Sequence, residues 1–173
     1  MSRAFVKEGD DELAAGEMPE RPLSGHPNYV TPRGLELLQA RLRELQEQRE
    51  RLAAEDEAMA KQKLLEVKRD IRYYAAQLES AKLVDPTGQP QDEVLFGATV
   101  SISDEDGKQH AFHIVGDDEA DVASGRISWA SPLAKAMIGA RVGDCVVWQR
   151  PAGATEVEIL AIRYEVGDAS RRD

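Results

Sequence analysis

The sequence predicts an α+β fold, in which an antiparallel helical hairpin precedes a small, mostly antiparallel sheet with one short helix. Three observations lead to this prediction. Residues 35–85 contain neither Gly nor Pro and carry two apolar ladders at helical spacing. Residues 99–115 and 156–164 contain runs that alternate like strands. Between these runs, Ser131-Pro132 is a capping residue followed by a proline, which predicts the start of a short helix.

A change of phase between the two ladders indicates a hairpin. The first ladder runs from Leu35 to Leu52 and the second from Ala60 to Ala81, both in steps of three and four residues. Because the first ladder, extended forward, meets polar residues, one straight helix would point its two stripes in different directions. Two antiparallel helices joined near residues 53–58 bring both stripes into one seam.

The ends of the hairpin are marked by local signals. Thr31-Pro32 supplies an N-cap and a proline for the first helix, and the second helix is expected to end before Pro86. Each arm would be about 30–35 Å long. The tip contains Glu55, Asp56 and Glu57, which are the candidate functional acids. The alternative is that these acids only favour a helix dipole, in a hairpin that serves as a spacer or a dimerisation element.

The sheet is expected in the C-terminal half. Residues 99–103 and 110–115 predict a strand pair, residues 126–129 a further strand, and residues 145–150 and 156–164 the last two. The final strand has apolar residues at both odd and even positions, which predicts a central strand covered on both faces.

We divide the chain into five parts. They are a mobile acidic tail over residues 1–30, the hairpin over 31–85, a turn-rich linker over 86–95, the sheet domain over 96–166 and a tail over 167–173.

Composition excludes several classes of function. The formal net charge is −10, and residues 84–173 hold eight basic and sixteen acidic side chains, so tight independent nucleic-acid binding is not expected. No apolar run is long enough for a membrane helix, and no secretory signal follows Met1, which favours a cytoplasmic protein. The single Cys145, in an apolar run, is expected to be buried. The three histidines are scattered, and no metal site is predicted.

Several stretches resemble the GreA/GreB family of bacterial transcription elongation factors, over about residues 28–165. The stretches are Tyr29-Val30-Thr31-Pro32-Arg33-Gly34, Phe96-Gly97-Ala98-Thr99-Val100, Ile114-Val115-Gly116-Asp117-Asp118-Glu119-Ala120-Asp121, Ile127-Ser128-Trp129-Ala130-Ser131-Pro132-Leu133-Ala134-Lys135-Ala136, Ile138-Gly139 and Val142-Gly143-Asp144. The resemblance implies an N-terminal coiled coil joined to an FKBP-like C-terminal domain.

The resemblance also implies a partner, bacterial RNA polymerase in its elongation complex. The C-terminal domain would dock at the rim of the polymerase secondary channel and the hairpin would enter it. Polymerase-binding candidates are Asp117, Asp118, Glu119, Asp121, Ser131 and Pro132. The protein would not be an enzyme and would need no cofactor, since Mg²⁺ would belong to the polymerase active site. In cleavage factors of the family, two tip acids help the polymerase bind a second Mg²⁺ and orient a water that hydrolyses backtracked RNA.

The sequence departs from the family at the tip. Cleavage factors carry a tip of the form Gly-Asp-Leu-x-Glu-Asn-Ala-Glu-Tyr, which this chain lacks, and its hairpin is shorter. Cleavage stimulation therefore stands beside a second interpretation, a channel-binding regulator without cleavage activity, similar to the short-hairpin relative Rnk. Two further alternatives are an FKBP-type prolyl isomerase and a coiled-coil adaptor; the adaptor would self-associate, whereas stripes that pair within one chain predict a monomer.

Overall fold

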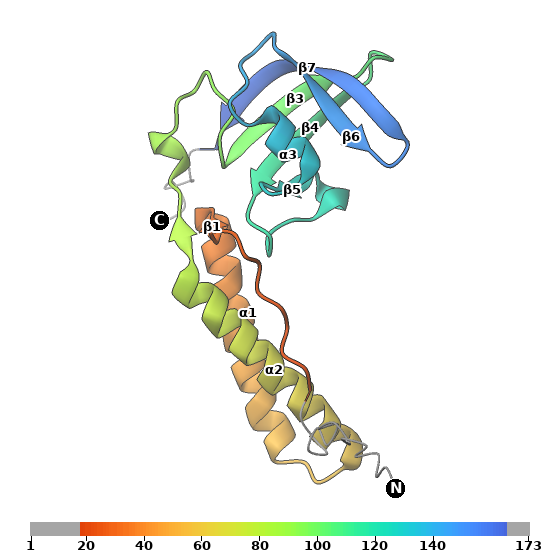
Figure 1. The fold of residues 1–173 in the computed structure, drawn as a ribbon. Coiled ribbons are helices and arrows are strands. Elements are labelled where there is room, and N and C mark those ends of the chain that lie inside the picture. Colours follow the sequence, from red (N-terminus) through yellow and green to blue (C-terminus); the bar gives the residue numbers. More distant parts are fainter. Residues whose placement is uncertain (1–17, 166–173) are drawn as a thin grey trace, which may run out of the picture. The chain divides into compact units, whose positions relative to one another are not determined.

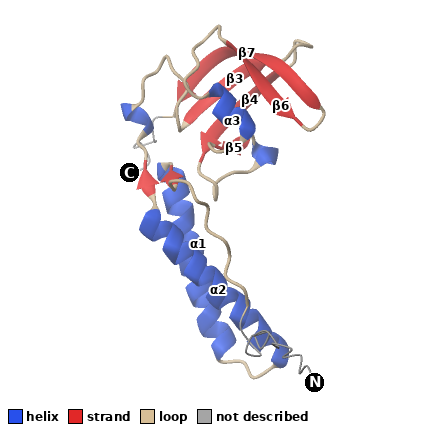
Figure 2. Ribbon diagram, viewed as in Figure 1, coloured by secondary structure: helices blue, strands red, loops and turns tan. Residues whose placement is uncertain are grey.

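The computed structural model describes residues 18–165, so the predictions made for residues 1–17 and 166–173 lie outside the described residues. Two compact units are present, one with residues 18–23 and 41–76 and the other with residues 24–40 and 77–165. After a two-residue strand, two long helices follow along the chain, and the strands of the main sheet come next with one short helix among them (Figures 1 and 2). The predicted α+β class is confirmed.

The helical hairpin consists of α1 (Pro32–Ala53) and α2 (Ala58–Ser80), which run antiparallel (Figure 1). The Thr31 hydroxyl accepts a hydrogen bond from the Gly34 N–H at 2.9 Å, so Thr31 is the N-cap that the sequence predicts. The connection at residues 54–57 lies where the phase of the apolar ladders changes.

Both apolar ladders contribute to one buried seam. Leu38 and Leu45 of α1 and Ala60 and Val67 of α2 are each less than 9% exposed. Isolated helices of this length are only marginally stable in water, so burial of this seam supplies much of the stability of the pair. No helix within residues 18–165 is long and apolar enough to cross a membrane.

A short parallel sheet closes the base of the hairpin. It pairs β1 (Tyr29–Val30) with β2 (Lys82–Leu83). The Lys82 N–H donates to the carbonyl oxygen of Asn28 at 2.8 Å instead of continuing the helix. Helix α2 therefore ends at Ser80, several residues before Pro86.

The segment just before the hairpin contacts α2. The guanidinium of Arg21 lies 3.8 Å from the ring centroid of Tyr73 and 3.5 Å from a carboxylate oxygen of Asp70. Glu20 forms an ion pair with Arg72 at 2.6 Å. Within the segment that was expected to be part of a mobile tail, cation–π and ionic contacts join Glu20 and Arg21 to the helix.

The main sheet has five strands in the order β5-β4-β3-β7-β6. They are β3 (Ala98–Ser103), β4 (Gln109–Val115), β5 (Arg126–Ser128), β6 (Cys145–Arg150) and β7 (Gly153–Tyr164). The pair β4–β5 is parallel and the other three pairs are antiparallel. Short 3₁₀ turns occupy η1 (Pro86–Gly88) and η2 (Val122–Ser124).

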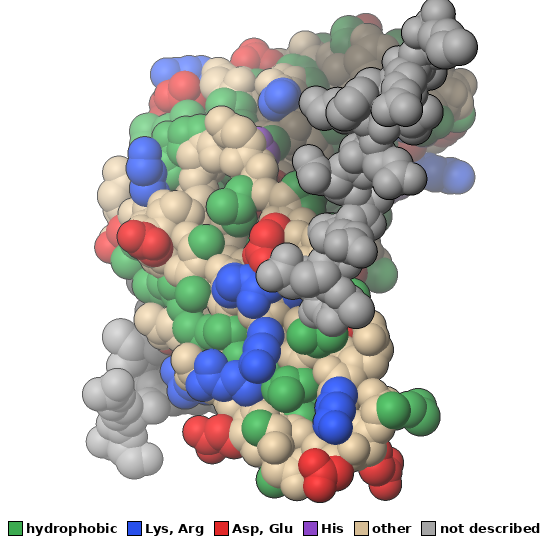
Figure 3. All heavy atoms as spheres, turned by 60° about the horizontal axis from the view of Figure 1, so that its bottom comes forward, with side chains coloured by type: hydrophobic (Ala, Val, Ile, Leu, Met, Phe, Trp, Pro, Cys, Tyr) green, Lys and Arg blue, Asp and Glu red, His purple; other side chains and the backbone are tan. Residues whose placement is uncertain are grey.

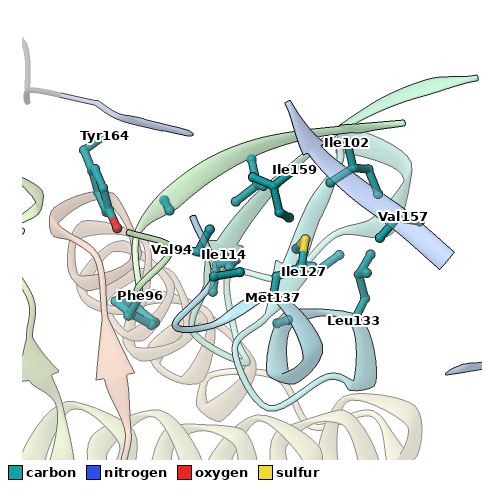
Figure 4. Close-up of a cluster of buried hydrophobic side chains, with 14 residues drawn as sticks. Val94, Phe96, Ile102, Ile114, Ile127, Leu133, Met137, Val157, Ile159 and Tyr164 are labelled. Atoms are coloured by element: carbon teal, nitrogen blue, oxygen red, sulfur yellow. The ribbon is translucent and has the colours of Figure 1, made fainter. Parts of the chain in front are cut away.

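Helix α3 (Pro132–Met137) packs on one face of this sheet and completes the core. Figure 4 shows Leu133 and Met137 of α3 among the buried side chains of the strands, which include Ile127 and Ile159. At the edge of the same cluster, the Tyr164 hydroxyl donates to the Glu93 carbonyl and accepts from the Leu95 N–H at 2.8 Å. The segment before β3 is thereby held to the last strand.

The final strand is central, but its apolar pattern has a different cause from the one expected. Val157 and Ile159 are buried, and further along the strand Tyr164 is buried at an even position. Ser101 pairs with Ala161 and Ile102 pairs with Ile159, so β7 has one extra residue at this point. This β-bulge shifts the alternation by one residue, and both sets of apolar side chains face the same core.

The expectation of a buried cysteine is wrong. Cys145 is exposed, and Val147 on the same strand is 51% exposed. Because β6 is an edge strand with one covered face, only Val146 and Trp148 pack against the core.

Candidate functional site

The hairpin tip is a four-residue turn between α1 and α2, and it carries all three predicted tip acids. The Glu55 N–H donates to the Leu52 carbonyl at 3.1 Å, which closes the last turn of α1. The Glu57 carbonyl accepts from the Lys61 N–H at 3.1 Å and so begins α2. Glu55, Asp56 and Glu57 are all exposed. Their position before α2 also favours its dipole, which stabilises the turn whatever else the acids do.

The tip is not a preformed metal site. Within residues 18–165, no group of three or more His, Cys, Asp or Glu side chains is placed to hold a metal ion. The first turn of α2 adds Met59, which is 84% exposed. On the face shown in Figure 3, basic side chains form small groups separated by acidic and apolar ones. The tip thus offers free carboxylates and one apolar side chain to a partner.

The loop after β4 holds four of the predicted binding residues, and its first residue must be glycine. A Cβ on Gly116 would lie 2.4 Å from the carbonyl oxygen of Tyr29 in β1. Backbone thus approaches backbone too closely for any side chain. Gly116 is therefore a packing position where the loop meets the strand that leads into α1.

Glu119 joins this loop to the start of α1. Its side chain is 2% exposed, and its carboxylate accepts a hydrogen bond from the Thr31 hydroxyl. Arg33 places a guanidinium nitrogen 3.8 Å from the same carboxylate. The Thr31 hydroxyl also caps α1, so one side chain serves both the helix and the buried acid.

The two aspartates beside Glu119 also have partners within the chain. Asp117 lies 2.6 Å from the His26 ring nitrogen and accepts a hydrogen bond from the Ser128 hydroxyl. The side-chain amide of Gln77, near the end of α2, donates to Asp118 at 2.6 Å. The acidic loop thus bonds both to the start of α1, through Glu119, and to the end of α2, through Asp118.

The remaining predicted residues lie further along the chain. Asp121 is exposed and accepts from the Ser124 hydroxyl at 2.6 Å, which lowers the pKa of its carboxyl. Ser131 caps α3 through a hydrogen bond from the Ala134 N–H at 3.4 Å, and the ring of Pro132 is exposed. These residues combine a local structural role with exposed surface.

Three residues of this network were not predicted from the sequence as site residues. His26 contacts Asp117, Gln77 contacts Asp118, and the amide of Asn28 donates to the Gln77 carbonyl at 2.8 Å. His26 lies 91 positions from Asp117 in the sequence, and Gln77 lies 41 positions from Asp118. Asn28 and Gln77 are 49 positions apart. Thr31 was predicted only as a cap, since no sequence pattern reveals its second bond.

The matching family model and the two relatives given first below are all described as transcription elongation factors. The family model "Transcription elongation factor, GreA/GreB, C-term" matches residues 89–164. The transcription elongation factor GreB of Neisseria meningitidis serogroup B is 38% identical over 153 residues, covering 79% of this chain and 94% of that protein. The transcription elongation factor GreA of Alkalilimnicola ehrlichii is 45% identical over 96 residues, covering 54% of this chain and 61% of that protein. Among solved structures, GreA factor homolog 1 (Gfh1) of Thermus thermophilus is 24% identical with a TM-score of 0.39, covering 80% of this chain and 99% of that one.

Proposed function

This chain belongs to the GreA/GreB family of transcription elongation factors, and we propose that it binds RNA polymerase and regulates elongation through the polymerase secondary channel. The tip of the helical hairpin is the observation that supports this proposal most strongly. Two arms of 22 and 23 residues, each about 33–35 Å long, carry three exposed acids on a four-residue turn. A narrow helical pair with a charged end suits insertion into a channel.

We assign three different roles to the candidate residues. Glu55, Asp56 and Glu57 act at the polymerase active site. Asp121 and Pro132, which are exposed, and the half-buried Ser131 offer surface for docking at the channel rim. Asp117, Asp118 and Glu119 hold the loop that carries Asp121, through the internal contacts described above.

The tip acids suit a metal only in the presence of a partner. Carboxylate oxygens are suitable Mg²⁺ ligands, but the tip alone has no cluster placed to hold an ion. Any ion would therefore take most of its ligands from the polymerase, and the tip would contribute one or two oxygens. The protein would then not be an enzyme itself, and hydrolysis of RNA would be carried out by the polymerase.

A second candidate function is occupation of the channel without cleavage. It is favoured by the tip sequence Ala54-Glu55-Asp56-Glu57, which lacks the acidic motif that the family resemblance associates with cleavage. In that case the three acids are turn residues, and their negative charge alone affects the channel. We further propose that the protein is a cytoplasmic monomer, since the seam of the hairpin is filled by side chains of one chain.

Transcript cleavage in a stalled, backtracked elongation complex distinguishes these candidates. The assay compares the complex alone, with the protein, and with a variant in which Glu55, Asp56 and Glu57 are replaced by Ala, at matched Mg²⁺. A matched control replaces the exposed acids Glu47, Glu50 and Glu79 by Ala. Faster release of short 3′ fragments, abolished in the tip variant and retained in the control, supports cleavage stimulation.

Polymerase binding is measured on the same variants. Binding without any acceleration of cleavage supports channel occupation instead. Loss of polymerase binding in the tip variant contradicts the division of roles between tip and loop, and absence of binding by the wild-type protein contradicts the proposed function itself.

A further inference from the structure

A cavity of about 500 Å³ lies within the unit that contains the sheet. Its walls come from the start of α1, from the segment between Val84 and Pro86, and from the face of β3 and β4 opposite the core. Volumes of this size are typical of sites for small molecules. The cavity is distinct from the hairpin tip and has no part in the function proposed above.

The charged side chains that line the cavity are mostly basic. They are Arg33 and Arg126, with Glu165 as the acid, and the His113 ring lies in the same wall. Neither arginine is saturated by its acidic neighbour. Arg33 lies 3.8 Å from the Glu119 carboxylate, beyond hydrogen-bond length, and Arg126 reaches Asp121 through one nitrogen at 3.5 Å. Both guanidinium groups therefore retain N–H donors for an anion, in the fork geometry that suits phosphate.

Two buried polar atoms at the cavity have no partner. Among residues 18–165, the buried side-chain nitrogens and oxygens without a hydrogen bond are Thr99 Oγ1 and Arg126 Nε. Both residues line this cavity. Buried polar groups are almost always paired in native proteins, so both side chains retain unused hydrogen-bonding capacity beside the cavity. The two atoms themselves are closed off from the cavity, and a rotation of each side chain would bring them to an anion bound there.

The rest of the wall indicates what the anion is attached to. Pro32, Val84, Pro86 and Ala111 give the cavity an apolar side. A long polyanion is disfavoured, because the chain as a whole carries a net charge of −10. We propose that the cavity binds a small organic phosphate, with its phosphate at Arg33, Arg126 and Thr99 and a planar group, such as a nucleobase, on the apolar side.

Calorimetric titration of the full chain tests this proposal with GMP and UMP as probes. Guanosine, which lacks the phosphate, and inorganic phosphate, which lacks the planar group, are titrated at the same ionic strength. We expect saturable binding of at least one nucleotide at a single site, with guanosine and inorganic phosphate each binding about tenfold more weakly or worse.

Three cavity variants and one control test the location. Arg33→Gln and Arg126→Gln should each weaken nucleotide binding by about tenfold or more, whereas Arg43→Gln, on an exposed part of α1, should leave it unchanged. Thr99→Val removes an unpaired hydroxyl, so it should weaken binding without lowering the melting temperature of the free protein. This last result would not follow from a merely structural role of Thr99.

The proposal is overturned if neither nucleotide binds the wild-type protein. It is equally overturned if inorganic phosphate binds as tightly as the nucleotides, or if binding survives all three cavity substitutions. None of these results bears on polymerase binding, which is measured separately.

Discussion

Replacement of Thr31 by Ala should destabilise the unit that contains the sheet far more than the loss of one small side chain implies. The Thr31 hydroxyl accepts from the Gly34 N–H at the start of α1 and donates to the buried Glu119 carboxylate. Loss of the cap costs about 1 kcal/mol. Loss of the donor leaves a carboxylate that is 2% exposed with only Arg33 nearby, which costs about 1–3 kcal/mol more.

The expected loss in the free energy of unfolding is therefore about 2–4 kcal/mol for Thr31→Ala. Thr31→Ser keeps the hydroxyl and should lose less than about 1 kcal/mol. Urea denaturation followed by tryptophan fluorescence measures both variants. The ring centroid of Trp129 lies 5.1 Å from that of Tyr29, two residues before Thr31, so the Trp129 fluorescence reports on this part of the molecule. The slope of the unfolding free energy against urea should not change between variants.

A double-mutant cycle then tests the link to Glu119. In a Glu119→Gln background no charge is left unpaired, so Thr31→Ala should cost about 1 kcal/mol less than it does in the wild-type protein. If Thr31→Ala lies within about 0.5 kcal/mol of the wild type, or if the two substitutions are additive, the reasoning about this buried bond is refuted.

Three further predictions follow from single positions. Gly116→Ala should lower the free energy of unfolding by about 1–3 kcal/mol, because the new Cβ would meet a backbone oxygen at 2.4 Å. The control Gly88→Ala, where a Cβ has nothing within 4 Å, should change the free energy of unfolding by less than about 0.5 kcal/mol. Equal effects of the two substitutions in urea denaturation would contradict this. Leu45 is 1% exposed in the hairpin seam, so Leu45→Ala should lower the free energy of unfolding by about 2–5 kcal/mol. The helical circular dichroism should then be lost at a lower urea concentration. An unchanged midpoint would show that the seam is not packed as described. A hydrogen bond with Glu156 raises the pKa of the exposed Cys145 thiol. The thiol should therefore react slowly with iodoacetamide at pH 8, and it should react faster in a Glu156→Gln variant. Equal reaction rates in the two proteins would show that Glu156 does not raise this pKa.

The helical hairpin could be predicted from the sequence because its signals are local and periodic. The phase change between Leu52 and Ala60 places the turn correctly, and Thr31-Pro32 places the start of α1. Helix α2 was predicted to end before Pro86, and it ends at Ser80. The residue at which it ends depends on a hydrogen bond from the Lys82 N–H to the Asn28 carbonyl, a long-range contact that no local pattern reveals.

The last strand shows how a local pattern can be ambiguous. Apolar side chains at both odd and even positions fit two covered faces, and they fit equally a bulge that shifts the alternation. Only the pairing of Ile102 with Ile159, beside that of Ser101 with Ala161, decides for the bulge. Cys145 was misplaced for a related reason, since the sequence of β6 does not show that it lies at the edge of the sheet.

The acidic loop was predicted as a site, but the internal role of its acids was not. Asp117, Asp118 and Glu119 satisfy hydrogen bonds with residues that lie 11 to 91 positions away. A run of acids in sequence carries no information on such partners. The close approach of Gly116 to β1 is likewise a three-dimensional constraint that a single glycine in the sequence does not specify.

Localised cleavage from the hairpin tip tests the central claim most directly. An iron chelate is attached to Asp56→Cys in a Cys145→Ser background, which is needed because Cys145 is exposed, and the labelled protein is added to a stalled elongation complex. The account predicts hydroxyl-radical cuts in polymerase segments around the active site and near the RNA 3′ end. Cuts confined to the outer surface of the polymerase, with binding confirmed, would contradict the proposal that the hairpin acts inside the channel.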